Sequence, residues 1–226
     1  MPLAIVAVPI GNPDDITLRA IKTLQETAIV IGEEAKPTRQ LLKALGIPVQ
    51  EKSIHLYKEH SQLADIAQLV ELCRNQLVAL ITDAGTPGFA EPGPALVQAC
   101  RQSNVPVYPV PGVSSLATLI SVGGIKLDSF MYAGFPPRDS ANRAQAMRSI
   151  TRMTIPVVLM DTPYRLTQTL AELAALAPQR RCTLGVDLTA PTEDIFEGRM
   201  SDALTRFRDQ KRKFILLLYP AHLTVR

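Results

Sequence analysis

Three glycine-containing loops each follow a short apolar run, and their residue types suit the binding of a small polar ligand. The longest follows Thr82 and reads Asp83-Ala84-Gly85-Thr86-Pro87-Gly88. The two others read Pro9-Ile10-Gly11-Asn12 and Pro111-Gly112-Val113-Ser114-Ser115. Because glycine lets a ligand approach the backbone closely, N–H and C=O groups there suit an amino-acid zwitterion or ribose hydroxyls. We therefore expect ligand contacts at these loops. The alternatives are plain turns and, for the two serines, helix capping.

The sequence lacks the residues of several common sites. It has neither a GxGxxG dinucleotide fingerprint nor a GxxxxGK[ST] phosphate loop. Its cysteines, Cys73, Cys100 and Cys182, are far apart, and there are only three histidines, which predicts neither a disulfide framework nor a metal site. The expected ligand is therefore neither a dinucleotide, nor a nucleotide held by a phosphate loop, nor a metal ion.

The first half of the chain alternates between apolar runs and amphipathic stretches. The predicted strands are Leu3–Val8, Ala28–Ile31, Ser53–Leu56, Leu77–Thr82 and Val105–Val110. The predicted helices are Thr17–Thr27, capped by Asp14 or Asp15, then Thr38–Leu45, Gln62–Asn75, Pro94–Gln102 and about 114–121. Continuous apolar strands alternating with helices are typical of a parallel sheet, and the loops above all follow its strands.

The second half has a different pattern. Strands are predicted at Phe130–Ala133, Val157–Met160, Cys182–Leu188, Glu193–Arg199 and Phe214–Tyr219, and helices at Ala141–Thr151, Tyr164–Ala175 and Asp202–Lys211. Two strands in direct succession imply antiparallel pairing. We therefore predict an α/β protein with a parallel-sheet domain, residues 1–112, and a mixed-sheet domain, residues 113–226.

Composition and charge narrow the class of protein. The chain of 226 residues is 46% hydrophobic and 20% charged, which predicts an ordered globular protein. No apolar run is long enough to span a bilayer, and the apolar start has no basic leader, so we expect no membrane segment and a cytoplasmic location. Residues 113–226 hold 15 Lys and Arg against 10 Asp and Glu, whereas residues 1–112 hold 9 against 11. This asymmetry fits a nucleic-acid-facing second half or simply a solvated surface.

Taken together and in this order, the loops resemble those of the tetrapyrrole-methylase superfamily, the class III S-adenosylmethionine-dependent methyltransferases. One branch is especially similar, the ribosomal small-subunit RNA cytidine 2′-O-methyltransferases. The segments that carry this likeness are Pro9–Asn12, Asp15–Ala20, Asp83–Pro87, Pro92-Gly93, Gly134–Pro137 and Arg165-Leu166. Charged positions depart from the branch: Glu33-Glu34-Ala35-Lys36 replaces Glu-Asp-Thr-Arg, and Met160-Asp161-Thr162 replaces Tyr-Glu-Ser.

The resemblance implies a two-domain fold with S-adenosylmethionine bound between the domains, and a homodimer. The implied cofactor contacts in the first domain and at the start of the second are Pro9, Gly11, Ala84, Gly85, Thr86, Phe89, Ser114 and Ser115. Met160 and Gly185 would line the adenine side. The implied activity is methyl transfer to a ribose 2′-hydroxyl of small-subunit ribosomal RNA. A tetrapyrrole C-methyltransferase and a non-catalytic relative that binds the cofactor or RNA are the alternatives.

A ribose hydroxyl is a poor nucleophile, so this activity needs a base within hydrogen-bond reach. The candidates are Glu33 (or its neighbour Glu34), His55 and Asp83, among which the sequence does not choose. An RNA substrate also requires cations for its phosphates. Four arginines in and after the Gly134–Pro137 loop are the candidates, namely Arg138, Arg143, Arg148 and Arg152. The partner expected from these residues is ribosomal RNA or the small ribosomal subunit.

Overall fold

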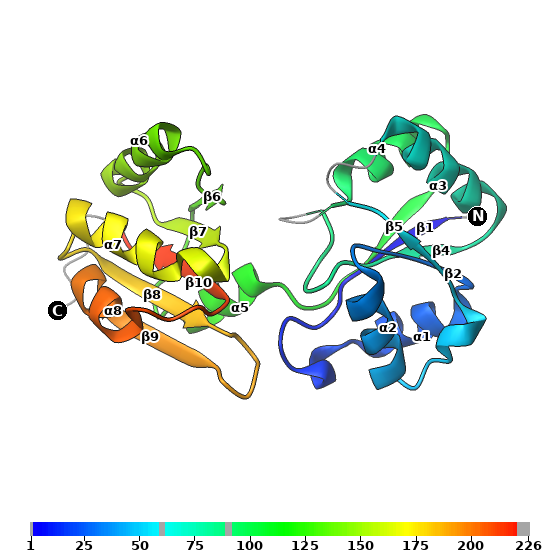
Figure 1. Cartoon of the computed structure of the whole chain (residues 1–226), viewed down its shortest axis with the longest axis horizontal. Helices are drawn as coiled ribbons and strands as arrows, with labels where there is room; N and C mark the ends of the chain where they lie inside the picture. The colour runs from blue at the N-terminus through cyan, green and yellow to red at the C-terminus, as the bar shows by residue number, and fades with distance from the viewer. Residues whose placement is uncertain (1, 59–61, 89–91, 221–226) are drawn as a thin grey trace. The chain divides into compact units, whose positions relative to one another are not determined.

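The fold is seen in a computed structural model that describes residues 2–58, 62–88 and 92–220. The chain divides into two compact units, Met1–Ser114 and Ser115–Arg226, each with its own sheet (Figure 1).

The first unit is built from five strands and the helices between them. Its strands are β1 (Leu3–Val6), β2 (Ile29–Gly32), β3 (Ser53–Leu56), β4 (Val78–Leu80) and β5 (Val107–Val110). Its helices are α1 (Leu18–Glu26), α2 (Ala35–Ala44), α3 (Leu63–Asn75) and α4 (Pro94–Gln102), with 3-10 turns at Pro13–Asp15 and Val49–Glu51. The strand order is β3-β2-β4-β1-β5, and every pairing is parallel. The predicted parallel sheet is confirmed.

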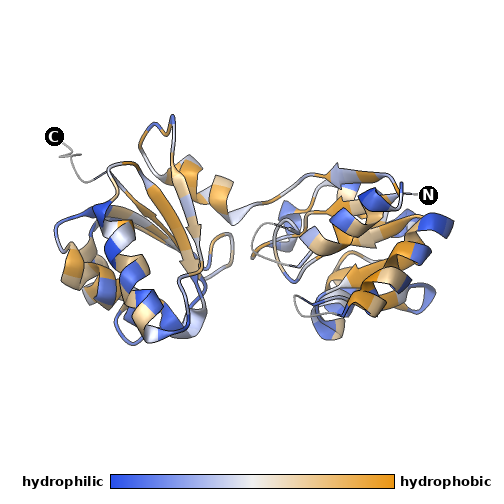
Figure 2. Cartoon of the chain, turned by 90° about the horizontal axis from the view of Figure 1, so that it is seen from above, coloured by the Kyte–Doolittle hydropathy of each residue, from blue (hydrophilic) through white to orange (hydrophobic). Residues whose placement is uncertain are grey.

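Helices cover both faces of this sheet, which explains why its strands are apolar throughout. Leu3 of β1 packs in a cluster with residues of α3 and α4, whereas Ala4 and Val6 pack with residues of α1 and α2. Figure 2 shows the hydrophobic colouring along the strands. Since both faces are buried, the strands read as continuous hydrophobic runs rather than as an alternation.

The start of α1 differs from the prediction. Thr17 is the N-cap, and its Oγ1 accepts a hydrogen bond from the Ala20 backbone N–H at 3.1 Å. Asp14 and Asp15, expected at that cap, instead lie in the preceding 3-10 turn, which Asn12 caps. The threonine lies directly before the first helical residue, where a hydroxyl reaches the orphan N–H groups of the first turn.

The second unit has a mixed sheet of five strands. They are β6 (Met131–Gly134), β7 (Val157–Asp161), β8 (Arg181–Val186), β9 (Asp194–Arg199) and β10 (Phe214–Leu218). The helices are α5 (Ser115–Val122), α6 (Ser140–Arg152), α7 (Leu166–Leu176) and α8 (Met200–Phe207), with a 3-10 turn η3 at Pro163–Arg165. The order is β6-β7-β10-β8-β9, and β6 pairs with β7 in parallel while the other pairings are antiparallel. The predicted mixed sheet is confirmed.

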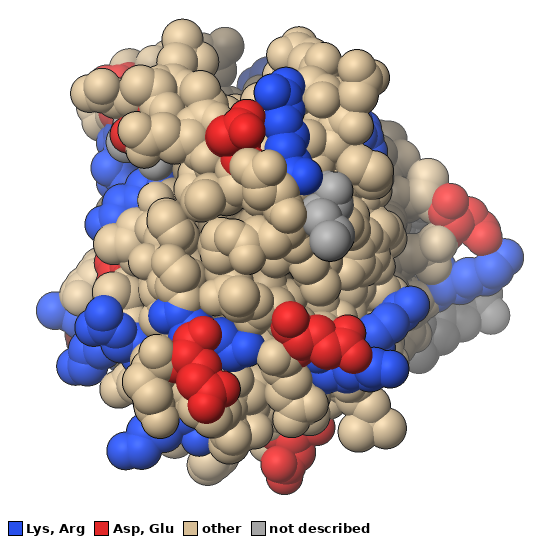
Figure 3. Space-filling view, turned by 90° about the vertical axis from the view of Figure 1, so that its right-hand side faces the viewer, with Lys and Arg blue, Asp and Glu red and all other residues tan. Residues whose placement is uncertain are grey.

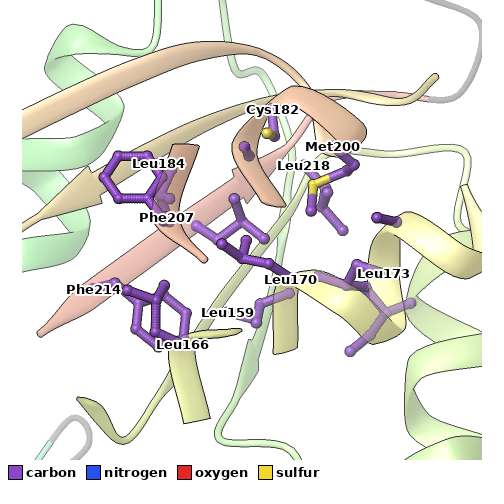
Figure 4. Packing of buried hydrophobic residues seen from close by; sticks show 14 of the residues in the cluster. Leu159, Leu166, Leu170, Leu173, Cys182, Leu184, Met200, Phe207, Phe214 and Leu218 are labelled. Carbon is purple, nitrogen blue, oxygen red and sulfur yellow. The ribbon is translucent and has the colours of Figure 1, made fainter. Parts of the chain in front are cut away.

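The core of this unit lies between the sheet and α6–α8. Figure 4 shows the side chains of α7, β8 and β10 converging there, with Leu170, Leu184 and Leu218 among the fully buried residues. The opposite face of β8 and β10 packs on α5. Tyr219 is buried there, where its hydroxyl donates to the Gly123 carbonyl and lies 2.8 Å from Thr183 Oγ1.

The helix predicted over Asp202–Lys211 is wrong at both ends, since α8 spans Met200–Phe207. Its end has a local cause. Asp209 adopts a left-handed backbone conformation, with φ at 61°, and its N–H donates to Thr167 Oγ1 at 3.0 Å. The chain after α8 is thereby fixed as a loop beside the start of α7.

Cys73, Cys100 and Cys182 are buried and free. Within the described ranges, no helix has the length and apolar character that crossing a bilayer would require. Charges of both signs are interspersed on the face shown in Figure 3.

Candidate functional site

The carboxyl ends of the first sheet form a point where the chain changes direction. Strands β1 and β4 are neighbours in the sheet. After β1 the chain continues to β2, which lies on the β4 side of β1, whereas after β4 it continues to β5, which lies on the opposite side of β1. Ligands of open α/β sheets bind outside the carboxyl ends of strands at such a switch point. The loops that the sequence singled out follow β1, β4 and β5, so they lie at this edge.

Hydrogen bonds tie these loops to one another. Val8 and Gly85 form an isolated antiparallel bridge, with N···O distances of 2.9 and 3.1 Å. Thr86 Oγ1 donates to the Val113 carbonyl at 2.9 Å, which joins the loop after β4 to the loop after β5. The structure therefore brings together the loops that carry Pro9, Thr86 and Ser114.

The backbone of the loop after β4 requires glycine at Gly85. Its φ is +81°, a left-handed value that side chains with a Cβ rarely adopt. A Cβ there would meet Ile10 Cγ2 at 3.4 Å, an ordinary contact, so the constraint is conformational rather than steric. Ala84 is half-buried and Gly11 is exposed. The other expected contact in this stretch, Phe89, lies outside the described residues.

The three base candidates occupy different positions. Glu33 follows β2 and Asp83 follows β4, and these two strands are adjacent, with Ile31 paired to Leu80. His55 lies within β3, the edge strand, where its Nε2 is 3.0 Å from Ser53 Oγ. The two carboxylates therefore lie at the carboxyl edge, whereas the histidine has a local partner inside a strand.

The two serines at the third loop lie at the junction of the units. Ser114 is the last residue of the first unit, and Ser115 is the first residue of α5. Both are half-buried. Their contact with the cofactor stays a prediction.

Met160 and Gly185 lie on one row of the second sheet. Both pair with Ile215 of β10, Met160 from β7 and Gly185 from β8. Space is tight at the second position, because a Cβ would lie 2.7 Å from Leu188 Cδ2 and 3.1 Å from Leu119 Cδ1, so these leucines would have to move. The Tyr132 hydroxyl donates to Met160 Sδ at 3.5 Å. Their place beside the adenine stays a prediction.

The structure contradicts the expectation for Arg143, whose side chain is only 3% exposed. Its Nη1 lies 2.8 Å from Asp161 Oδ2, its Nε 2.8 Å from Glu172 Oε2, and its Nη2 donates to Thr169 Oγ1 at 2.8 Å. Such a guanidinium is paired with two carboxylates inside the protein and does not reach an RNA phosphate. The sequence held a signal for this, because Arg143 heads an i, i+4, i+7 stripe with Met147 and Ile150, both buried.

The other three arginines, Arg138, Arg148 and Arg152, are exposed. They remain candidates for RNA contacts. A further buried arginine, Arg180, has no signal in the spacing of the sequence, and it donates to the carbonyls of Thr151, Met153 and Tyr219. It binds the carbonyl end of α6, so its role is structural.

Comparison with known proteins identifies the family. The sequence profile of the tetrapyrrole (corrin/porphyrin) methylases matches residues 2–204. The chain belongs to the tetrapyrrole methylase family.

Relatives of this methylase carry a more specific name. Ribosomal RNA small subunit methyltransferase I of Neisseria meningitidis serogroup B is 37% identical over 97% of the chain and 76% of the relative. The protein of that name from Thermotoga maritima is 31% identical over 92% of the chain and 93% of the relative. Relatives of this kind support a methyltransferase.

Solved structures share the fold of the methylase at lower identity. Diphthine synthase has a TM-score of 0.73 at 13% identity, covering 97% of this chain and 90% of that chain. Uroporphyrin-III C-methyl transferase from Thermus thermophilus, complexed with S-adenyl homocysteine, has a TM-score of 0.68 at 21% identity, covering 97% of each chain. At these identities, the likeness concerns the fold.

The cofactor of the methylase is S-adenosylmethionine, and the carboxyl edge of the first sheet fits it chemically. S-adenosylmethionine carries two cationic groups, an ammonium and a sulfonium. Carboxylates suit such cations, and Glu33 and Asp83 place two of them after the adjacent strands β2 and β4. Small residues, Ala84 and Gly85, leave backbone groups for its amino-acid portion. Among the residues that the structure describes, no group of histidines, cysteines and carboxylates is arranged to hold a metal ion.

Proposed function

We propose that this methylase transfers a methyl group to a ribose 2′-hydroxyl of small-subunit ribosomal RNA. The observation that carries the proposal is the similarity to proteins named ribosomal RNA small subunit methyltransferase I, which extends over 97% of the chain at 37% identity. The loop Asp83–Pro87, whose sequence resembles the ribose-methylating branch, supports the choice of the ribose hydroxyl.

The first task of the protein in this reaction is positioning. S-adenosylmethionine, when bound, supplies an electrophilic methyl group on a sulfonium. Displacement at that carbon requires the attacking oxygen in line with the leaving sulfur, so rigid loops are an advantage. The bridge between Val8 and Gly85 and the bond from Thr86 to Val113 supply that rigidity at the carboxyl edge.

The second task is the removal of a proton. The hydroxyl oxygen forms its bond to carbon as its proton passes to a base. Glu33 and Asp83 are the better candidates, because they follow adjacent strands at the edge where the loops meet. His55 is the weaker candidate, since it lies within the edge strand beside Ser53.

The third task is to hold the RNA. Arg138, Arg148 and Arg152 are exposed on and before α6, and the half of the chain that contains them has an excess of cations. Cations of this kind fix the register of a nucleic acid through its phosphates. We propose that these three arginines, without Arg143, contact the RNA backbone.

The test is a methyl-transfer assay with labelled S-adenosylmethionine. The purified chain is incubated with unmodified small ribosomal subunits in one reaction and with uroporphyrinogen III in another. We expect label in the ribosomal RNA and none in the tetrapyrrole. Label in uroporphyrinogen alone would establish the tetrapyrrole alternative. Cofactor binding by calorimetry without transfer to either substrate would indicate a non-catalytic relative.

We further propose that the methylase acts in the cytoplasm, where its ribosomal substrate would be. We also propose that it is a homodimer, because dimers are common in its superfamily. Light scattering at micromolar concentration measures the mass directly. A mass of twice 24.7 kDa is expected, and a monomer mass would contradict the proposal.

A further inference from the structure

An exposed aromatic side chain lies just after the carboxyl end of β7. Tyr164, in η3, is 80% exposed, well above the exposed phenylalanines Phe130 at 36% and Phe135 at 45%. Exposing an aromatic ring to water is unfavourable, and such rings are enriched where they contact partners. Its surroundings indicate what kind of partner the ring fits.

Cations flank the ring. The Lys211 ammonium lies 5.8 Å from the centroid of the Tyr164 ring, within the range of a cation–π contact. The next residue, Arg165, keeps a quarter of its side chain exposed, and its Nη1 lies 3.9 Å from Asp161 Oδ1. The loop that carries Lys211 also carries Arg208, Arg212 and Lys213, against one acidic residue, Asp209.

The backbone beneath the ring is held in place from the interior. Asp161 Oδ1 accepts a hydrogen bond from the Thr162 N–H at 2.8 Å, and the Arg165 N–H donates to the Thr162 carbonyl at 2.9 Å. Asp161 is itself fixed by Arg143 and by Thr169, whose Oγ1 donates to Asp161 Oδ2 at 2.9 Å. The buried network therefore orders the turn that presents Tyr164.

The loop that carries Lys211 is also fixed. Asp209 donates from its N–H to Thr167 Oγ1 at 3.0 Å, which joins this loop to the start of α7. Arg212 Nε lies 2.8 Å from Asp187 Oδ2, so this arginine joins the loop to the residue that follows β8. The exposed ring and the lysine against it are thus presented together by two ordered segments.

We propose that Tyr164 is a stacking platform for an unpaired base of the RNA substrate, with Lys211 and Arg165 contacting the adjacent phosphates. An aromatic face beside cations is the arrangement that binds single-stranded nucleic acid, because every base has a π face and every linkage a negative charge. Unpaired bases of loops and bulges are the parts of RNA that proteins read by stacking. This inference rests on the proposed RNA substrate and names a residue that contacts it.

The chain allows a direct spectroscopic test, because it contains no tryptophan. Tyr164→Trp keeps an aromatic ring at the site and makes it the single indole of the protein. Stacking of a base on this indole is expected to quench its fluorescence when a short single-stranded RNA is added. Inorganic polyphosphate, which has charge but no bases, is expected to leave the emission unchanged.

A matched control places the single indole at the other end of the helix that follows η3. Leu176→Trp lies at the far end of α7, where the native side chain is 46% exposed. That position is about 15 Å along α7 from Leu166, the residue with which the helix begins after η3. RNA is expected to leave the emission of this variant unchanged, and equal quenching of both variants would overturn the proposal.

Affinity gives a second, independent readout. Tyr164→Ala is expected to weaken binding of the same RNA, measured by fluorescence anisotropy, by about 5- to 150-fold. Tyr164→Phe keeps the ring and is expected to recover most of that factor. Lys211→Gln is expected to reduce the slope of log K against log salt by about 0.7.

The outcomes separate this inference from the proposed function. If the parent protein methylates ribosomal RNA while Tyr164→Ala binds RNA as the parent does and Tyr164→Trp is not quenched, the stacking proposal is wrong and the function stands. If the parent neither binds nor methylates RNA, both are wrong. Quenching that is specific to position 164, together with the weaker binding of Tyr164→Ala, supports the platform.

Discussion

The carboxyl end of β4 and the carboxyl end of β7 are built in opposite ways. After β4, the loop is fixed mainly through its backbone, by the bridge between Gly85 and Val8. After β7, the turn is fixed through buried charges, with Asp161 held by Arg143. A backbone-built site tolerates few changes of conformation, whereas a charge-built turn tolerates few changes of charge.

This difference separates cofactor binding from stability. A substitution in the loop after β4 is expected to act chiefly on affinity for S-adenosylmethionine, because it distorts a surface edge. A substitution in the network after β7 is expected to act chiefly on folding, because it leaves a charge buried without its partner.

The largest effect is expected for Arg143→Ala. It removes the partner of Asp161, whose side chain is 1% exposed, and the free energy of unfolding should fall by about 3–5 kcal/mol. Urea denaturation followed by circular dichroism measures the change. Arg148→Ala, on the exposed side of the same helix, is the control and should change stability by no more than about 0.5 kcal/mol. Equal effects of the two variants would show that the buried network does not carry the stability.

The next effect is expected for Gly85→Val. A β-branched residue at a φ of +81° is strained, so the loop should leave its conformation and S-adenosylmethionine binding should be abolished in titration calorimetry. Gly46→Val is the matched control, because Gly46 has a φ of +67° with nothing within 4 Å and lies after α2. The control should lose a comparable amount of stability but keep its affinity. Unchanged affinity in Gly85→Val would refute the placement of the cofactor.

A smaller effect is expected for the exposed arginines. Alanine at Arg138, Arg148 or Arg152 should weaken RNA binding, and each phosphate that is no longer neutralised should lower the slope of log K against log salt by about 0.7–0.9. Affinity for S-adenosylmethionine should not change. If the triple variant binds and methylates RNA as the parent does, these arginines serve only as a solvated helix surface.

The smallest effect is expected for His55→Ala. The imidazole bonds to Ser53 on an edge strand, so methyl transfer should stay within about twofold of the parent rate. By contrast, the carboxylate that acts as the base should show a large effect. Of Glu33→Gln and Asp83→Asn, the variant that removes the base should lower the rate of methyl transfer by about 100-fold or more. A fall in rate in His55→Ala that matches the fall in a carboxylate variant would reverse this assignment.

Local patterns predicted much of the fold. Continuous apolar runs such as Val78–Leu80 mark strands buried on both faces, and the helix over Pro94–Gln102 begins and ends where its proline and its polarity indicate. Glycine and proline at strand ends are equally local signals, so they mark the loops of the candidate site. The burial of Arg143 does not follow from its residue type, because arginines are mostly exposed, and only its helical spacing with Met147 and Ile150 indicates it.

Other features depend on contacts between residues distant in the sequence. The proposed role of Tyr164 depends on its contact with Lys211, which lies 47 positions further along the chain, and no local pattern in the sequence links the two residues. The row shared by Met160 and Gly185 likewise depends on the register of both strands with Ile215. Such juxtapositions arise from topology rather than from propensity or periodicity.

The chemical position of the transferred methyl group tests the central claim most directly. Alkali cleaves RNA through attack of the 2′-hydroxyl on the neighbouring phosphate, so a 2′-O-methylated linkage resists hydrolysis. Small-subunit ribosomal RNA labelled by the protein from S-adenosylmethionine would be hydrolysed in alkali and its fragments separated by size and charge. The account predicts label in an alkali-stable dinucleotide. Label confined to mononucleotides would place the methyl group on a base and would contradict it.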